Sequence, residues 1–430
     1  MSSIITNEFR VQNAQNFIND VKLYNYYITI GKIDDWKKNQ SLNPPSNRNT
    51  NLYCWKSMIG GKRILDSRVS LIIPRIDWTM GVTYAMYDDT NDELDSSSFY
   101  VVTDEANVYK CLYNNNNQPS TIKPTGTNIS NITLSDGYIW KFMYNISIEE
   151  SNNFMTNNFM PVKTLLEDNG TVQWTIQQNA INGAVDVIKV VNGGLGYEAA
   201  PEVVINGDGS GATAIASIED GVVTKIQIID GGQGYTYATV NLIGDSIQPA
   251  SARAILSPKG GHGSDPANEL FGRYVMVGAT LSADEDNQLP ITNDFRIITI
   301  LRDPTFKGNP EYTEDFTIPV VFNELTRITL DSGYSGEFNL DDTITGLTSG
   351  ATGKLASIDN STNIISLCNV NGNFINNETI ETSSGGLSIV SSLEEPDLVK
   401  DTGRIIYIDY RNPISRAEDQ EENIRVTLEF

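Results

Sequence analysis

The start of the chain passes from a helical to an extended spacing of apolar side chains. One amphipathic helix is predicted near the N-terminus, where apolar residues recur every three or four positions: Val11, Ala14, Phe17, Ile18 and Val21. The run 26–30 is rich in β-branched and aromatic residues and predicts a strand that ends at Gly31. Residues 40–51, rich in Asn, Ser and Pro, predict a loop, and a short helix is expected over 52–59.

From residue 99 onward the pattern is that of strands and turns. Residues 99–102 and 108–113 flank a polar link, which predicts a hairpin, and an alternating strand is expected over 138–146. Further strands are predicted at the following places: 295–301, 316–322, 404–409 and 423–430. The predicted class is therefore mainly β, with a β-sandwich-like core domain, few helices and two small β-repeat domains inserted into it.

The first of these repeats lies between residues 184 and 256. A β-rich run over 185–191 leads into Gly193-Gly-Leu-Gly-Tyr197, and a second run over 222–229 leads into Gly231-Gly-Gln-Gly-Tyr235. Gly234 follows Gly196 by 38 residues, a period typical of repeated supersecondary units. The glycines permit positive φ angles, and each tyrosine ring is expected to pack over its turn. Strand-forming residues follow both motifs, whereas a phosphate loop opens a helix, so no nucleotide site is predicted.

A second duplication covers residues 330–390. Phe338 and the run Asp342-Thr-Ile-Thr-Gly346 recur 36 residues later as Phe374 and Glu378-Thr-Ile-Glu381. Ser349-Gly350 recurs as Ser384-Gly385. These residues again favour short strands and tight turns, as expected for a second small β module.

Composition and charge narrow the classes of partner. The 430 residues carry 54 acidic against 30 basic side chains, a formal charge of −24. Nucleic acids and membrane surfaces are both anionic and call for basic patches, so neither is expected as a partner. No apolar run approaches the ~20 residues that cross a bilayer. The first ten residues lack a basic and an apolar region, so no secretory signal is expected and the protein is predicted to be made in a cytoplasm.

Few residues have the chemistry of a catalytic or metal centre. Cys54, Cys111 and Cys368 are too far apart for metal-ligand spacing and are expected to be buried thiols. His262, the one histidine, adjoins Ser264 and Asp265, but a triad usually draws on distant residues. It is interpreted as a loop histidine with a structural hydrogen bond. No catalytic, cofactor or metal residues are predicted.

Adjacent aspartates are candidates for acid/base pairs or for calcium ligands. They occur at 34–35, 88–89 and 341–342. Glycosidases need two carboxylates across a cleft, and sequence does not show that separation. Asp also favours turns through local backbone hydrogen bonds, and no calcium-loop pattern is present. Solvated turns are therefore the preferred interpretation.

An ordered set of short segments carries a family resemblance. The longest is the stretch 68–78, Arg-Val-Ser-Leu-Ile-Ile-Pro-Arg-Ile-Asp-Trp. The others, in order, are Phe9-Arg10, Asn16-Phe17, 27–31 with Trp36, 136–140, 294–296, 302–304, 403–407, 411–413 and 419–420. In this order the segments resemble a baseplate wedge subunit of contractile-tailed, T4-like bacteriophages. The resemblance reaches both ends of the chain but fails over roughly 180–260 and 327–398.

The resemblance implies both an organisation and a role. A discontinuous wedge core is expected at 1–180, 260–326 and 399–430, with inserted modules at 181–259 and 327–398. The chain is then a structural subunit of the virion tail baseplate, assembled in the host cytoplasm and without enzymatic activity. Its expected partners are a second copy of itself, in a homodimer, and other wedge proteins, with no small-molecule substrate and no cofactor. The subunit is expected to take part in the rearrangement that triggers sheath contraction.

Candidate contact residues lie mainly in the longest segment. Arg75 and Asp77 form a possible charge-assisted pair, Trp78 supplies an apolar anchor, and Trp36 is added from the upstream segment. Trp and Arg dominate interface hot spots, which favours a subunit contact. The alternative is an internal brace of the core, and sequence alone leaves the two open.

Two other functions compete with the structural one. The Gly-Tyr repeats could present exposed aromatic rings to sugars, which makes a tail-associated carbohydrate- or receptor-binding protein the main alternative. A tail-associated glycan hydrolase with paired carboxylates is the third, although no segment resembles such enzymes.

Overall fold

The fold was analysed in a computed structural model of the chain. It describes residues 6–32, 48–91, 93–285, 288–291, 293–308, 320–331, 335–417 and 419–430. The protein is 45% strand and 12% helix, which confirms the predicted mainly-β class with few helices. The chain divides into two compact units that alternate along the sequence, 1–16 with 70–275 and 428–430, and 17–69 with 276–427. They are called unit 1 and unit 2.

Four elements cross the sequence boundaries between the units: α1 (Asn7–Leu23), β3 (Val69–Pro74), β15 (Tyr274–Ser282) and β25 (Glu421–Glu429). The predicted N-terminal helix is confirmed as α1, on which Val11, Ala14 and Val21 are buried. The alternating C-terminal strand is confirmed as β25, whose side chains alternate between exposed and buried.

Unit 1 contains a central antiparallel sheet of four strands in the order β4-β5-β7-β6. Its strands are β4 (Tyr100–Val102), β5 (Asn107–Asn114), β6 (Ile132–Thr133) and β7 (Tyr138–Asn145). The predicted hairpin is confirmed, because Tyr100 pairs with Lys110 and Val102 with Val108. Strand β3 pairs separately with β8 (Phe159–Pro161), and three short helices complete this part: α3 (Ile148–Phe154), α4 (Val172–Gln178) and α5 (Pro266–Glu269).

An aromatic cluster fills the interior beside the central sheet. Trp140 and Tyr138 stack at 5.5 Å between ring centroids, and Tyr84 meets Trp140 edge-on at 5.7 Å. All three rings are buried, together with Val187 and Ile255 from the following strands. This core holds the loop after β3 in place, since Tyr84 belongs to that loop.

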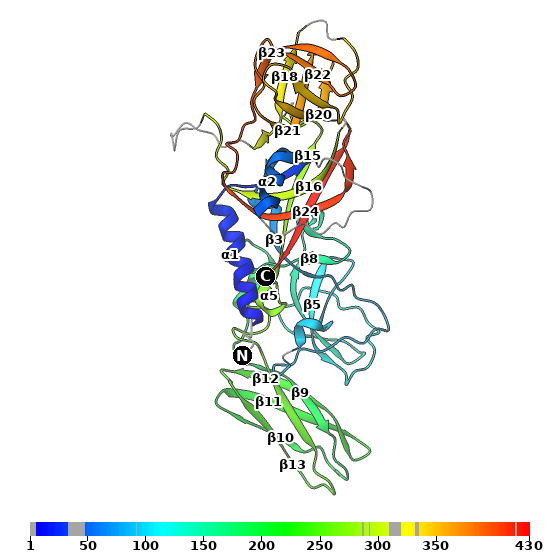
Figure 1. Cartoon of the computed structure of the whole chain (residues 1–430). Helices are drawn as coiled ribbons and strands as arrows, with labels where there is room; N and C mark the ends of the chain where they lie inside the picture. The colour runs from blue at the N-terminus through cyan, green and yellow to red at the C-terminus, as the bar shows by residue number, and fades with distance from the viewer. Residues whose placement is uncertain are drawn as a thin grey trace. The chain divides into compact units, whose positions relative to one another are not determined.

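The Gly-Tyr repeats fold into two small sheets, drawn in green in Figure 1. One has the order β11-β12-β9-β14 and the other is the pair β10-β13. The strands are β9 (Val185–Asn192), β10 (Glu202–Gly207), β11 (Ser210–Glu219), β12 (Val222–Gln233), β13 (Ala238–Ile243) and β14 (Ser251–Leu256). Strands of one copy pair with strands of the other: β10 with β13, β11 with β12 and β14 with β9. Ile188 and Ile226, 38 residues apart, pair with each other at the centre of this exchange.

The tyrosines and glycines of the two copies occupy matching positions. The Tyr197 hydroxyl accepts a hydrogen bond from the Ala250 backbone at 2.7 Å, and the Tyr235 hydroxyl accepts one from Ala212 at 3.3 Å. Each phenol therefore anchors a strand of the other copy. The second and third glycines of each motif have positive φ, with φ of 66° and 79° at Gly194 and Gly196 and of 61° and 76° at Gly232 and Gly234.

Unit 2 is built on an antiparallel sheet with the order β17-β2-β1-β16-β24. Its strands are β1 (Tyr26–Gly31), β2 (Met58–Arg63), β16 (Asp294–Arg302), β17 (Val321–Asn323) and β24 (Arg404–Ser415), and α2 (Arg48–Ser57) precedes β2. The predicted strand over 295–301 is interior in this sheet, whereas the one over 404–409 lies at an edge. The prediction over 316–322 falls mostly outside the described residues, and β17 begins only at Val321.

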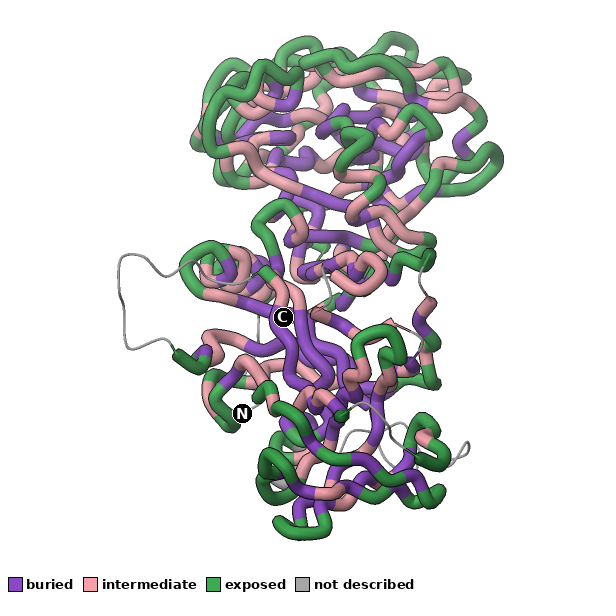
Figure 2. The backbone as a smooth tube through the Cα atoms, turned by 90° about the horizontal axis from the view of Figure 1, so that it is seen from above, coloured by how far each residue is buried: buried purple, intermediate pink, exposed green. Residues whose placement is uncertain are grey.

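The second duplication closes into a six-stranded barrel with the order β18-β21-β20-β19-β22-β23. The strands are β18 (Thr326–Leu330), β19 (Thr343–Gly346), β20 (Thr352–Asp359), β21 (Ile364–Asn371), β22 (Thr379–Thr382) and β23 (Leu387–Glu394). The equivalent strands β19 and β22 pair around Thr345 and Glu381, which are 36 residues apart. Ile344, Leu355 and Ile380 are buried within the barrel. Figure 2 shows the same division over the described chain, with buried residues in the interior and exposed residues at the outer turns.

The two duplicated acids also exchange partners inside the barrel. The Asp342 carboxylate accepts hydrogen bonds at 2.7 Å from the hydroxyls of Ser383 and Ser384 in the second copy. The Glu378 carboxylate accepts from the Ser349 backbone at 2.9 Å and its hydroxyl at 3.0 Å in the first copy. The recurrence of an acid at this position thus has a structural reason, which is to close a turn of the opposite copy.

Candidate functional site

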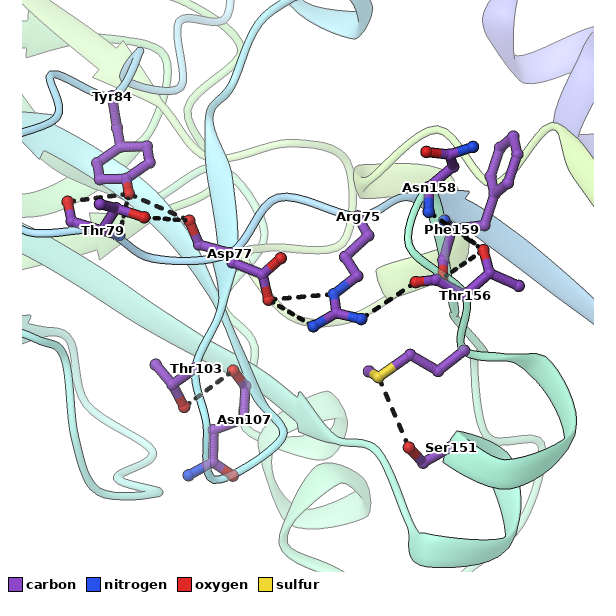
Figure 3. A network of polar contacts seen from close by, with 11 residues as sticks. Arg75, Asp77, Thr79, Tyr84, Thr103, Asn107, Ser151, Thr156, Asn158 and Phe159 are labelled. Carbon is purple, nitrogen blue, oxygen red and sulfur yellow. Dashed lines mark hydrogen bonds and ion pairs between the residues drawn. The ribbon is translucent and has the colours of Figure 1, made fainter.

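The predicted contact residues Arg75 and Asp77 form a hydrogen-bonded pair just after β3 (Figure 3). Arg75 Nε and Nη2 donate to Asp77 Oδ1 at 3.1 and 2.9 Å, and Arg75 Nη1 donates to the Thr156 carbonyl at 3.1 Å. Pro74 ends the strand, and Asp77 then forms an isolated bridge with Val102. The arginine therefore links two loops, while the Asp77 side chain stays more than half exposed.

Trp78 is anchored on the central sheet of unit 1. Its backbone N–H donates to the Val102 carbonyl at 2.9 Å, and its indole Nε1 donates to Ser120 Oγ at 3.1 Å. The half-buried ring packs against the aromatic cluster that contains Trp140. Trp78 thus has the contacts expected of an internal brace, and its indole N–H already has a hydrogen-bond acceptor in Ser120.

The loop that follows Trp78 exposes apolar side chains on a fixed backbone. Met80 is 68% exposed and Val82 is 40% exposed. The Gly81 N–H donates to the Ser120 carbonyl at 2.7 Å, and the Ser120 N–H donates to the Val82 carbonyl at 2.9 Å. Residues 77–83 are called the contact loop. Exposed apolar groups on an ordered loop are typical of an interaction surface.

The four predicted contact residues do not all fall in the described part of the chain. Arg75, Asp77 and Trp78 are brought together as adjacent members of one loop, whereas Trp36 lies outside the described residues. A role for these side chains in subunit contact stays a prediction.

A buried charged cluster, which was not predicted, lies beneath the central sheet of unit 1. Lys110 Nζ donates to Glu269 Oε2 at 2.8 Å, and both side chains are almost fully buried. Glu269 also accepts from the backbone N–H of Gly263 at 2.7 Å. His262 lies in the same cluster, with Nδ1 3.8 Å from Glu269 and Nε2 3.8 Å from Asp186. Its ring meets Tyr87 edge-on at 4.8 Å.

The environment of this cluster fixes its protonation. Burial opposes ionisation of Glu269, but the adjacent Lys110 ammonium, together with His262, holds the pKa of Glu269 below its ordinary value. Burial lowers the pKa of His262, and the nearby Lys110 charge lowers it further. His262 is therefore a neutral imidazole at neutral pH.

A cavity of about 550 Å³ adjoins the charged cluster. Its lining includes the charged and polar side chains of Lys141, Asp186, Lys225 and His262, and the apolar side chains of Ile139 and Ile228. All of these residues belong to unit 1. The cavity falls within the size range of ordinary small-molecule sites.

The arrangement around His262 agrees with the sequence analysis in one respect, because its neighbours Ser264 and Asp265 do not form a triad with it. Ser264 Oγ donates to the Gly261 carbonyl at 2.8 Å, and Asp265 caps the short helix α5 through the Asn268 N–H at 3.2 Å. The partners of His262 are instead the distant Asp186 and the buried Glu269, at ion-pair rather than hydrogen-bond distance. Both distances exceed hydrogen-bond length, so the expected structural hydrogen bond does not form with these two groups.

The aspartate pairs have structural partners. Asp88 and Asp89 both bind the Arg253 guanidinium, at 2.5 and 3.0 Å. Asp341 lies 2.8 Å from Lys32, and the pair 34–35 lies outside the described residues. The described pairs are thus ion-paired or hydrogen-bonded rather than merely solvated.

Within the ranges that the structure describes, no group of three or more His, Cys, Asp or Glu side chains has metal-binding geometry.

Two further expectations concern cysteine and tyrosine. All three cysteines are free and buried, as predicted, and burial raises the pKa of the Cys54 thiol to about 12. The repeat tyrosines are buried as well, with Tyr197 3% and Tyr235 6% exposed. Their rings pack in the module core, so they do not offer the exposed stacking surface on which the carbohydrate hypothesis was based.

The fold and these sites describe a mainly-β protein with duplicated modules and an exposed contact loop. No protein-family model matches the chain. The sequence is similar to "Baseplate wedge protein gp8" of Enterobacteria phage T4, with 26% identity over 229 residues. The match covers 41% of this chain and 66% of gp8, so it spans just under two thirds of that relative. In the described part of the chain, no helix is long and apolar enough to cross a membrane.

Proposed function

We propose that this chain is a structural subunit of a baseplate wedge in a contractile-tailed bacteriophage. The similarity to gp8 carries the proposal, because gp8 is a baseplate wedge protein. The mainly-β architecture, with several separately cored sheets, suits a rigid connector. In this role the subunit forms a homodimer, holds neighbouring wedge proteins together in the virion tail and has no enzymatic activity.

The mechanism of such a subunit is mechanical. Stiff β units keep neighbouring proteins at fixed angles, and contacts between subunits repack when the baseplate changes state before sheath contraction. Assembly contacts of this kind bury about 2,000–5,000 Å². With a formal charge of −24, association rests on apolar and hydrogen-bonded surface rather than on long-range attraction between copies.

The domain organisation proposed for this role is a wedge core with modules inserted at 181–259 and 327–398. The ends of each module support it. Ser257 N–H donates to the Ala184 carbonyl at 2.8 Å, and Asp397 N–H donates to the Asn323 carbonyl at 2.9 Å. The chain therefore leaves and rejoins the remainder of its unit at adjacent points, as tolerated insertions do.

The contact loop is the surface proposed for subunit association. Met80→Glu places a charge on a side chain that is 68% exposed, so it should leave the fold intact and weaken association. Leu166→Glu is the matched control, because Leu166 is 93% exposed elsewhere in unit 1. The measurement is native mass of each purified variant, alone and mixed with the other wedge proteins of the same phage.

Wild type and Leu166→Glu should form a dimer and enter a wedge complex, while Met80→Glu should be shifted towards monomer at an unchanged melting temperature. A persistent wild-type monomer that joins no wedge complex contradicts the proposed function. Dimers of unchanged affinity in Met80→Glu contradict only the placement of the contact on this loop.

A further inference from the structure

The cavity of unit 1 joins two parts of the chain that have different sequence character. Lys141 comes from β7 of the central sheet, whereas Asp186 and Lys225 come from β9 and β12 of the Gly-Tyr module. His262 reaches the cavity from the loop after the module. A ligand in this space would therefore touch both the core and the module.

The lysines at this cavity lack the partners that buried cations usually have. Lys141 is buried and donates to the Ile129 carbonyl, a neutral group. Among the described residues, no carboxylate lies within ion-pair distance of Lys141 or Lys225. Asp186 Oδ1 is instead bound by Asn131 Nδ2 at 2.8 Å. The lining contains one carboxylate, Asp186, but the buried Lys141 ammonium spends its hydrogen bond on a neutral carbonyl and so keeps capacity for an anionic ligand.

The charge of the lining is opposite to that of the protein. Two lysines against one aspartate, with His262 neutral, give this cavity a net positive lining in a chain of net charge −24. The positive lining therefore favours a ligand with a small anionic group. The remaining lining residues favour a ligand that also carries hydroxyl groups and an apolar face. Asp186 can accept from hydroxyls, and Ile139 and Ile228 can cover a ring face.

We propose that this cavity binds a small sugar acid, with its carboxylate held by Lys141 and Lys225. Asp186 accepts hydrogen bonds from ring hydroxyls, and the isoleucines pack on the apolar face of the ring. The inference concerns a different surface from the contact loop and does not depend on the wedge role.

The test is calorimetric titration of the full-length protein with glucuronate, with glucose as the uncharged counterpart. Glucuronate should bind and glucose should bind far more weakly, and added salt should weaken glucuronate binding. Lys225→Gln should reduce glucuronate affinity about tenfold, the value of one charge-assisted hydrogen bond. Lys189→Gln is the matched control, because Lys189 is a half-buried lysine of the same module that does not line the cavity.

Each outcome decides the proposal. Equal binding of glucose and glucuronate overturns it, as does a failure of both glucuronate and a uronate-containing oligosaccharide to bind. An equal loss of affinity in Lys189→Gln and Lys225→Gln also overturns it. Binding of an acidic peptide, with no binding of glucuronate or of a uronate-containing oligosaccharide, overturns it in favour of a protein carboxylate. A uronate-containing oligosaccharide titrated in parallel distinguishes a free sugar acid from one within a chain, and binding of either supports the proposal. Unchanged melting temperatures in both variants ensure that lost binding is not lost folding.

Discussion

Glu324 keeps a carboxyl group in the interior of unit 2, on the link between β17 and β18. Burial raises its pKa to about 8, against an ordinary value of 4.5, and the Leu398 N–H at 3.3 Å offsets this only in part. The folded protein therefore holds a proton between pH 4.5 and 8 that the unfolded chain releases. Stability should fall as pH rises through this interval, by about 1.4 kcal/mol per pH unit for this group.

Glu324→Gln removes that titration while keeping the shape of the side chain. The free energy of unfolding, measured with denaturant, should fall less steeply between pH 5 and 8 in the variant than in wild type. Glu381→Gln is the control, since Glu381 is exposed on the barrel surface. A pH dependence that is identical in wild type and Glu324→Gln contradicts a buried, protonated carboxyl group.

Some contacts between single residues could not be predicted from the sequence. Lys110 lies within the predicted strand 108–113, and alternation alone does not reveal that its partner is Glu269, 159 residues later. The signal was a lysine among apolar neighbours, which identifies an unusual position but not its contact. By contrast, Arg75 and Asp77 are two residues apart, so their pairing was predictable from sequence.

The phenol hydroxyls of Tyr197 and Tyr235 should contribute unequally to the stability of the Gly-Tyr repeat. Tyr197→Phe leaves the buried ring in place but removes the acceptor of the Ala250 N–H at 2.7 Å, which should lower the free energy of unfolding by about 1–2 kcal/mol. Tyr235→Phe removes a longer contact, 3.3 Å to Ala212, and should have the smaller effect. Denaturant unfolding measures both. An equal or reversed ranking contradicts unequal phenol contacts in the two copies.

The repeat periods of 38 and 36 residues could be seen in the sequence, and so could the glycine-rich turns that permit positive φ. Which strands pair could not be seen there. Local patterns fix where a strand begins and ends, but β10 pairs with β13 and β11 with β12 across the copies. That exchange depends on long-range closure, as does the barrel order. Helix α3 was missed although Ser147 and Glu150 form a capping box, a signal present in the sequence.

The proposed insertion of a barrel module at 327–398 can be tested by deletion. In the barrel module, Asp397 N–H donates to the Asn323 carbonyl at 2.9 Å, and Asn323 N–H donates to the Asp397 carboxylate at 2.7 Å. A two-glycine turn can therefore replace residues 326–395 without moving the flanking chain. The barrel has its own apolar core, which includes Ile344, Leu355 and Ile380, so its removal leaves few apolar contacts open.

The shortened chain should remain folded, with a cooperative thermal transition, and should still be a dimer. The reason is that the buried residues of the barrel core do not pack against the sheet that contains β1 and β16. The matched control is a chain in which Ile344→Asp disrupts the barrel from within. It should lose the barrel's contribution to circular dichroism and expose apolar surface that the clean deletion does not. If the deletion unfolds the remainder of unit 2, residues 327–398 are an integral part of the core and the insertion hypothesis fails. A folded but monomeric product would instead move a subunit contact onto the barrel.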